Sequence, residues 1–239
     1  MAAGNYNFAA VLRVLSEETV TPVCLDCSYE AARFYGFCPK CYKRLPIVKA
    51  PLCPKCGAEN DGIFDICRKC LKENERPWEK GFSVMRMERH AKELIHRFKY
   101  GGETALARAF GRMIAEKLMN FRKEYSCIVP VPMHWSRRIS RGYNQTELVA
   151  RITAKQLGLP LVNALKRTKR TPKQAALDRK ARLTNIAGAF SPQNGIDFGS
   201  GRVLLIDDVM TTGTTLSEAA GTLRSAGAEE VDTVVVCRA

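Results

Sequence analysis

Cysteine is the first residue type in this sequence whose spacing can support chemistry. Eight of the ten cysteines form four Cys-x-x-Cys pairs, and all four pairs lie in the first third of the 239-residue chain. The third and fourth pairs repeat the first two 29 positions later, which indicates the duplication of a unit of two pairs. The pairs are Cys24 and Cys27, Cys38 and Cys41, Cys53 and Cys56, and Cys67 and Cys70.

Metal binding is the chemistry that this spacing favours. Two residues between thiolates allow a tight turn to present both sulfurs to one ion, and two such turns complete a tetrahedral shell of four sulfurs. We therefore predict two structural zinc ions bound by the eight cysteines. A dithiol redox motif is the alternative, but four copies at a fixed period fit it poorly. Either consecutive or crossed pairs could share an ion, and the duplication favours consecutive pairs.

A second pattern combines an apolar run with carboxylates and hydroxyls. Residues 203–206 read Val-Leu-Leu-Ile, and Asp207 and Asp208 follow at once. A threonine-rich loop then leads into a helical pattern, where Thr215 and Glu218 predict a capping box. In open parallel sheets ligands bind beyond the strand ends, and N–H groups at a helix start bind anions. The carboxylates could accept hydrogen bonds from ribose hydroxyls while the loop holds a phosphate. An acidic turn before an ordinary helix is the alternative.

These residues carry a family resemblance. Residues 203–215 resemble the phosphoribosyl-pyrophosphate (PRPP) binding motif of type I phosphoribosyltransferases at all thirteen positions. More narrowly, the chain resembles the ComF (competence protein F) family, in which cysteine knuckles precede such a domain. Residues 138–145 support this resemblance, as does a spaced set of side chains: Arg167, Gln174, Arg182, Asn185, Gly188 and Phe190. The resemblance covers nearly the whole chain.

The resemblance implies ligands and a biological role. It implies that the chain binds PRPP with Mg²⁺, and that Asp207 and Asp208 are the catalytic pair that orients the ribose. It also implies a role in DNA uptake during natural transformation. Type I enzymes further need a hood that recognises a base, and the sequence identifies neither a hood nor an acceptor. The 5′-phosphate would lie on the loop formed by Met210, Thr211, Thr212, Gly213, Thr214 and Thr215.

Basic residues form two further groups. Arg137, Arg138 and Arg141 follow a predicted strand, and we predict that they bind the pyrophosphate end of PRPP. Residues 166–182 contain eight basic side chains and a single acid. This segment is predicted to close over pyrophosphate or to contact the backbone of a nucleic acid. Charged side chains that are merely solvated are the alternative for both groups.

Composition limits the classes of protein that fit. The chain has 46% hydrophobic residues and a formal net charge of +14, which indicates a folded protein with a polyanionic partner or a phosphate-rich ligand. No stretch approaches the ~18 apolar residues of a membrane span, and the apolar residues 8–15 lack the basic segment that precedes a signal sequence. We therefore expect no membrane span, no cleaved signal and a cytoplasmic location.

Alternating strand and helix patterns must position these sites. Strands are predicted at 82–86, 127–131, 203–206 and 231–237, and helices at 5–18, near 94–98, and at 103–119, 144–157 and 216–226. This order predicts an α/β fold with a parallel sheet and helices on both faces, which the resemblance narrows to the type I phosphoribosyltransferase kind. The predicted domains are an N-terminal helix (1–19), a small zinc-ribbon module with two four-cysteine units (20–75) and a phosphoribosyltransferase-like domain (76–239).

Three functions compete at this stage. The first is a PRPP-binding protein that handles single-stranded DNA during natural transformation, and the resemblance favours it. The second is an active phosphoribosyltransferase that transfers phosphoribose from PRPP to an acceptor and releases pyrophosphate. The third is a zinc-ribbon adaptor for another protein. The expected partners are PRPP, single-stranded DNA and a protein of the DNA-uptake machinery.

Overall fold

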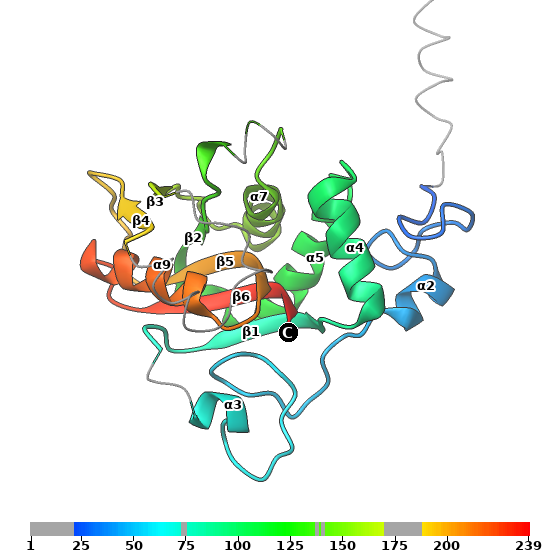
Figure 1. Ribbon diagram of the computed structural model, residues 1–239, viewed down its shortest axis with the longest axis horizontal. Helices are drawn as coiled ribbons and strands as arrows, with labels where there is room; N and C mark the ends of the chain where they lie inside the picture. The colour runs from blue at the N-terminus through cyan, green and yellow to red at the C-terminus, as the bar shows by residue number, and fades with distance from the viewer. Residues whose placement is uncertain (1–21, 73–75, 137–138, 140–141, 170–187) are drawn as a thin grey trace, which may run out of the picture.

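A four-stranded parallel sheet forms the centre of the protein (Figure 1). The computed structural model describes residues 22–72, 76–136, 139, 142–169 and 188–239. The four predicted strands are present, whereas the helix predicted over residues 5–18 lies outside the described residues. Neighbouring strands are all parallel, in the order β1 (Gly81–Arg86), β6 (Val231–Arg238), β5 (Arg202–Met210) and β2 (Tyr125–Pro130).

The sheet separates two hydrophobic cores, because successive side chains of a strand point to opposite faces. On β5, Leu204 and Ile206 join one core, and Val203 and Leu205 join the other. None of these four side chains is exposed to solvent. Strands that are buried on both faces carry continuous apolar runs, which explains the pattern at residues 203–206.

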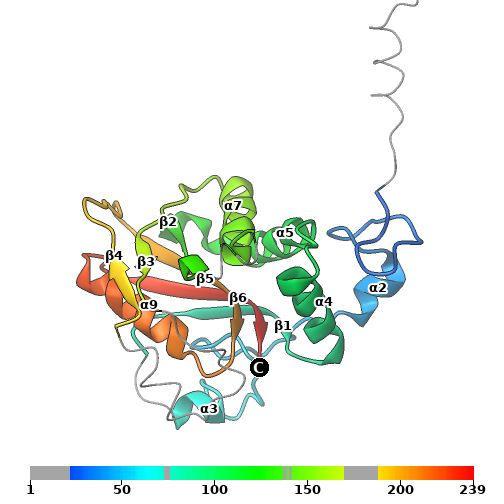
Figure 2. The ribbon, with the colours of Figure 1, turned by 45° about the horizontal axis from the view of Figure 1, so that its top comes forward.

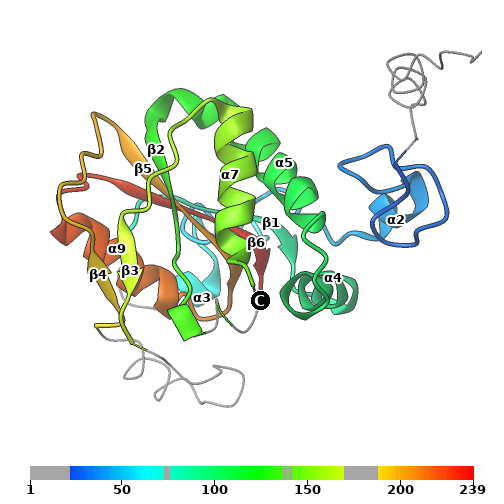
Figure 3. The ribbon, with the colours of Figure 1, turned by 90° about the horizontal axis from the view of Figure 1, so that it is seen from above.

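Three helices cover the first face, on the opposite side of the sheet from α9 (Figure 3). They are α4 (Arg89–Tyr100), α5 (Leu106–Leu118) and α7 (Gln145–Leu157), and a short 3-10 helix, η1 (Met119–Glu124), joins α5 to β2. Helix α7 begins after Asn144, whose side chain accepts a hydrogen bond from the Thr146 N–H. It ends at Gly158, which adopts the left-handed conformation that commonly stops a helix.

The second face is covered by α9 (Thr214–Ser225), by a two-stranded antiparallel ribbon and by the second cysteine unit. The ribbon consists of β3 (Leu165–Arg167) and β4 (Phe190–Pro192), which were not predicted. Each of its strands has three residues, too few for a period to be recognised. Helices cover both faces, as predicted. Within the described ranges, no helix is both long and apolar enough to cross a bilayer.

The two cysteine units lie apart, one at each core (Figures 1 and 2). The first unit contains α2 (Pro39–Arg44) and lies beside α4. The second contains α3 (Arg68–Leu71) and lies below the sheet in the view of Figure 1. The buried cysteines of each unit therefore contribute to a core that also includes strands of the sheet.

The second unit lies against strand β1, backbone to backbone. A Cβ atom on Gly57 would come within 2.3 Å of the Ser83 backbone nitrogen, and one on Gly81 within 2.4 Å of the Lys55 carbonyl oxygen. The Ser83 hydroxyl donates to the Gly57 carbonyl oxygen at 2.6 Å. The buried indole of Trp78 donates to the Lys55 carbonyl oxygen at 2.8 Å. Glycine at both positions is what permits this approach.

Helix packing generates the first prediction, which concerns Gly111. A Cβ atom on Gly111 of α5 would come within 2.6 Å of Ile152 Cβ of α7, so Gly111→Ala should push these helices apart. We expect it to lower the free energy of unfolding by about 1–3 kcal/mol. A Cβ atom on Gly221 of α9 would meet no other atom within 4 Å, so Gly221→Ala should raise stability by about 0.5–1 kcal/mol.

Urea denaturation followed by circular dichroism measures both changes. The two substitutions are chemically identical and both lie inside helices. A difference in sign between their effects on stability therefore reflects whether the added methyl group has room. An unchanged or increased stability of the Gly111→Ala protein would contradict the close packing of α5 on α7.

Candidate functional site

The eight paired cysteines form two clusters, and consecutive pairs share each one. In each set the four sulfurs lie within 4.8 Å of one another, which confirms the consecutive pairing that the duplication favours. Cys27 Sγ lies 4.0 Å from Cys38 Sγ, and Cys56 Sγ lies 3.7 Å from Cys67 Sγ. Zinc–sulfur bonds of about 2.3 Å place two sulfurs of a tetrahedron ~3.8 Å apart, so both clusters fit zinc. The sets are Cys24, Cys27, Cys38 and Cys41, and Cys53, Cys56, Cys67 and Cys70.

The duplication is also visible in the backbone of the two units. The Ser28 N–H donates to the Cys24 carbonyl oxygen at 3.0 Å, and the equivalent Gly57 N–H donates to the Cys53 carbonyl oxygen at 2.8 Å. Ser28 and Gly57 share a left-handed conformation, with φ of 59° and 67°. The second pair of each unit starts at the residue that precedes a short helix, α2 or α3. Each unit therefore presents one pair from a turn and one from a helix start.

The thiols of the first cluster differ in how readily they ionise. Backbone N–H groups of Glu30 and Tyr29 lower the pKa of Cys27 to about 7, whereas burial raises the pKa of Cys41. Four thiols this close cannot all ionise without a cation, because their negative charges repel. A divalent metal ion would supply that cation and deprotonate all four. The donor set is therefore complete for a closed structural site.

Strand β5 carries the two carboxylates of the second predicted site. The predicted strand end at Ile206 is wrong, because Asp207 and later residues up to Met210 still pair with β6. Asp208 lies two residues after Ile206 and therefore on the face that α4 covers. Its Oδ1 forms an ion pair with Lys99 Nζ of α4 at 2.7 Å, and both side chains are largely buried.

The charges around the acid pair are partly balanced by the protein itself. The Thr146 hydroxyl and the Asp208 N–H donate to Asp207 Oδ1, at 3.3 and 2.8 Å. Burial and the charge of Asp208 raise the pKa of Asp207 to about 7. Burial alone would lower the pKa of Lys99, but the charge of Asp208, its hydrogen bond and the charge of Asp207 together outweigh burial and raise that pKa above its ordinary value. Lys99 therefore stays charged and offsets one carboxylate.

Lys99 was not predicted as a site residue, although the sequence contains a signal for it. It lies one turn after Ile95, on the side of α4 that faces the sheet. A lysine at a position where the helical period expects an apolar residue needs a partner, because an unpaired buried charge is costly. The partner itself cannot be inferred from the helix, since Asp208 is 109 positions away.

The threonine-rich loop turns directly into α9. Gly213 precedes the first helical residue with a φ of 84°, and it has no side chain that could cap the first turn. The Thr214 N–H donates to the Thr212 hydroxyl in a long hydrogen bond of 3.5 Å, and N–H groups at a helix start can bind an anion. A small hollow is lined by Asp207 and by residues 209–216. The predicted capping box is wrong, because Glu218 accepts a hydrogen bond from the Gly188 N–H instead.

Arg76 brings a positive charge to this loop and was also not predicted. Its guanidinium lies over the Trp78 ring, 4.9 Å from the centroid, and its Nη1 lies 3.4 Å from Met210 Sδ. A Cβ atom on Gly213 would come within 2.7 Å of the same nitrogen. Arg76 lies between the last paired cysteine and β1, in a mostly polar stretch of sequence where no periodic pattern marks a site. The second cysteine unit supports it, because Trp78 donates its hydrogen bond to Lys55.

The predicted pyrophosphate-binding arginines, Arg137, Arg138 and Arg141, lie outside the described residues. So does most of the basic segment 166–182, apart from residues 166–169. Within that described part, Arg167 of β3 lies over the Phe190 ring at 5.3 Å from its centroid, and its charge partly offsets the rise in the Asp207 pKa. The segment therefore starts close to the acid pair.

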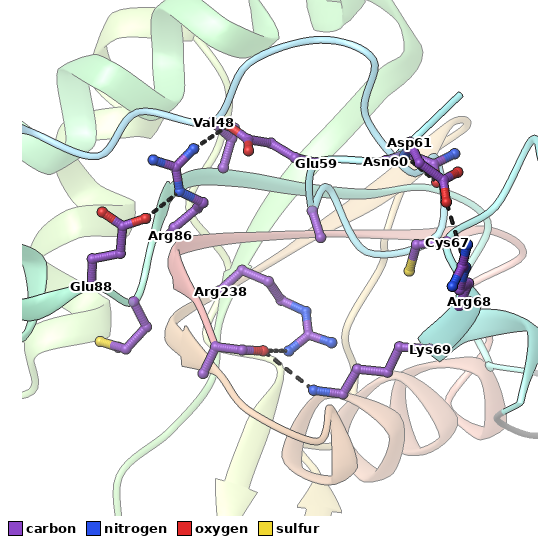
Figure 4. A pocket seen from close by; sticks show the side chains of 13 residues that line it. Val48, Glu59, Asn60, Asp61, Cys67, Arg68, Lys69, Arg86, Glu88 and Arg238 are labelled. Carbon is purple, nitrogen blue, oxygen red and sulfur yellow. Dashed lines mark hydrogen bonds and ion pairs between the residues drawn. The ribbon is translucent and has the colours of Figure 1, made fainter. Parts of the chain in front are cut away.

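A larger cavity of about 590 Å³ opens beside the ends of β1 and β6 (Figure 4). The second cysteine unit lines one side of it, and the last residues of both strands line the other. Lys69 Nζ and Arg238 Nη1 both donate to the Thr211 carbonyl oxygen, at 3.5 and 2.5 Å. Arg86 forms ion pairs with Glu59 and Glu88 across the cavity wall. The cavity thus adjoins the threonine-rich loop.

The two clusters generate a prediction about metal content. The freshly reduced protein should carry two zinc ions per chain, and Cys27→Ser and Cys67→Ser should each remove one, because the clusters share no ligand. These cysteines are matched, since each is the half-buried member of its cluster. Elemental analysis of the wild-type and variant proteins measures the outcome. One zinc ion or none in the wild-type protein, or the loss of both ions from either variant, would contradict two separate sites.

Comparison with known proteins finds two families that match parts of the chain and relatives that match most of it. Residues 145–239, which include β5, the loop and α9, match the phosphoribosyl transferase domain family, and residues 50–75 match a domain family of unknown function. The chain is 29% identical to DNA utilization protein YhgH of Escherichia coli, covering 92% of this chain and 98% of that protein. It is 25% identical to competence protein ComFC of Streptococcus pneumoniae, covering 97% of this chain and 93% of that protein.

A further relative is more similar in sequence. Competence protein F of Haemophilus influenzae is 34% identical over 211 residues, which cover 85% of this chain and 91% of that protein. Because it leaves out only 15% of this chain, the match must extend into both the cysteine-rich part and the sheet. The resemblance seen in the sequence is therefore confirmed, and the chain belongs to the competence protein F (ComF) family.

Proposed function

We propose that this protein binds PRPP with Mg²⁺ at the end of strand β5, holds two structural zinc ions and handles single-stranded DNA during natural transformation, in the cytoplasm. The observation that carries the PRPP part is the junction of Asp207 and Asp208 with the start of α9, where Gly213 provides no side-chain cap. The DNA part is supported by the names of the relatives, which are competence proteins and DNA utilization proteins.

The two ends of the junction suit different parts of PRPP. The start of α9 and Arg76 suit the 5′-phosphate, since both present positive charge to the loop at 211–213. Asp207 and Asp208 suit the ribose, because carboxylates accept hydrogen bonds from vicinal hydroxyls. Mg²⁺ would neutralise pyrophosphate charge and is usually bound by one or two carboxylates together with phosphates. Lys99 would hold Asp208 in place and keep the net charge of the acid pair low.

The acid pair generates a prediction for ligand binding. Asp207→Asn combined with Asp208→Asn should weaken the binding of Mg²⁺–PRPP at least tenfold, which is about 1.4 kcal/mol, because charged acceptors for the ribose are lost. Isothermal titration calorimetry measures the affinity, and circular dichroism checks that the variant remains folded. Asp197→Asn removes one exposed acid outside the junction and should leave the affinity unchanged. Equal affinities of the double variant and the wild-type protein would place the ligand elsewhere.

An active phosphoribosyltransferase is the second candidate, and the cavity of about 590 Å³ favours it. An acceptor bound there would lie next to Thr211, whose carbonyl oxygen already contacts both Lys69 and Arg238. The release of pyrophosphate from PRPP, measured over a broad panel of bases and nucleotides, separates the candidates. Release above the rate without acceptor would establish a transferase, whereas binding of PRPP without release would leave it as a ligand of a DNA-handling protein.

A further inference from the structure

The first cysteine unit presents aromatic rings to solvent. The rings of Phe34 and Tyr42 are stacked, with centroids 5.1 Å apart and an angle of 27°, and Tyr35 lies against Tyr42 at 5.8 Å. We call these three residues the aromatic face. Phe34 is 46% exposed, and Tyr29 on the neighbouring turn of the unit is 91% exposed. Rings that pack on one another at the surface, with part of their area left in water, are a feature of binding surfaces.

The backbone of the unit holds Phe34 outward. Phe34 and Phe37 exchange two backbone hydrogen bonds, of 2.9 and 2.8 Å, across the two-residue turn of Tyr35 and Gly36. Both turn residues have positive φ, 53° and 95°, as a tight hairpin turn requires. Phe37 is completely buried, so the turn fixes one phenylalanine inside and the other at the surface. A ring that is already fixed loses little conformational entropy on binding.

Exposed cations are the sequence neighbours of two residues of the aromatic face. Arg33 directly precedes Phe34, and Lys43 and Arg44 directly follow Tyr42, and all three cations are exposed. The first cysteine unit therefore carries exposed aromatic rings and exposed cations at neighbouring positions of the chain, and the long side chains of arginine and lysine extend the reach of those charges.

The acids of the same unit are already engaged with cations. Glu30 forms an ion pair with Lys40 at 2.7 Å. Asp26 forms one with Arg97 of α4 at 3.2 Å, and it is largely buried. Neither carboxylate therefore needs Arg33 or Lys43 as a partner, so these cations can contact an anionic ligand.

We propose that the aromatic face binds single-stranded DNA, with unpaired bases stacked on Phe34 and with phosphates contacting Arg33, Lys43 and Arg44. Stacking of bases on aromatic rings beside a basic rim is the way proteins bind single strands without reading their sequence. Duplex DNA offers only its phosphates, because its bases are already stacked on one another. This inference rests on the DNA part of the proposed function and adds the surface and the mode of contact.

Fluorescence anisotropy with labelled oligothymidylate and the full-length protein tests this inference. Phe34→Leu keeps an apolar side chain against Tyr42 but removes the ring, and it should weaken binding at least fivefold, whereas Phe34→Tyr should retain the affinity. Phe64 is a matched control, since it is 52% exposed in the second cysteine unit, and Phe64→Leu should have no effect. Zinc content and thermal unfolding check that each variant is folded.

The dependence on salt separates stacking from phosphate contact. Phe34→Leu should leave the slope of log affinity against log salt unchanged, whereas Arg33→Gln with Lys43→Gln should reduce it by up to about 1.4. Wild-type binding that Phe34→Leu does not weaken, or that Phe64→Leu weakens equally, would overturn the aromatic face as the DNA site. Wild-type protein that does not bind the oligonucleotide at all would instead overturn the DNA part of the proposed function.

Discussion

The contact between the second cysteine unit and strand β1 determines how the surroundings of the threonine-rich loop are built. Gly57 and Gly81 let two backbones approach so closely that no side chain fits between them. This contact seats Trp78, which in turn supports Arg76 above the loop that precedes α9. The same unit brings Lys69 to the Thr211 carbonyl oxygen. A small cysteine-rich module thus supplies cations to a site whose carboxylates belong to a different part of the chain.

Much of the architecture follows from local patterns. The strand at residues 203–206 and the helix that starts after Asn144 are marked by a continuous apolar run, an N-cap and a closing glycine. The pairing of the cysteines follows from their 29-residue repeat. The strand end was placed too early, because carboxylates were taken to end a strand although pairing with β6 continues beneath them. The β3–β4 ribbon is too short to leave a period in the sequence.

The parts of the site that could not be predicted are those that depend on distant contacts. Lys99 meets Asp208 only because α4 packs on the same face of the sheet, and no local pattern names that partner. In the sequence, nothing distinguishes Arg76 from the other charged residues around it. Its role becomes visible only in the structure, where its guanidinium lies over the Trp78 ring. A pattern can identify the residues that need a counter-charge. The tertiary fold decides which residue provides it.

The two cysteine units have the same turn geometry but different neighbours, and the neighbours decide which residues each turn accepts. Ser28 and Gly57 occupy equivalent left-handed positions. Ser28 is exposed, so its side chain projects into water, whereas a side chain at Gly57 would collide with the Ser83 backbone nitrogen. The first copy could therefore not replace the second, because its serine would not fit at the position of Gly57. Position 28 has room for a side chain that tolerates the left-handed conformation, whereas position 57 has room only for glycine, so the two copies share their cysteine spacing but accept different residues at this turn.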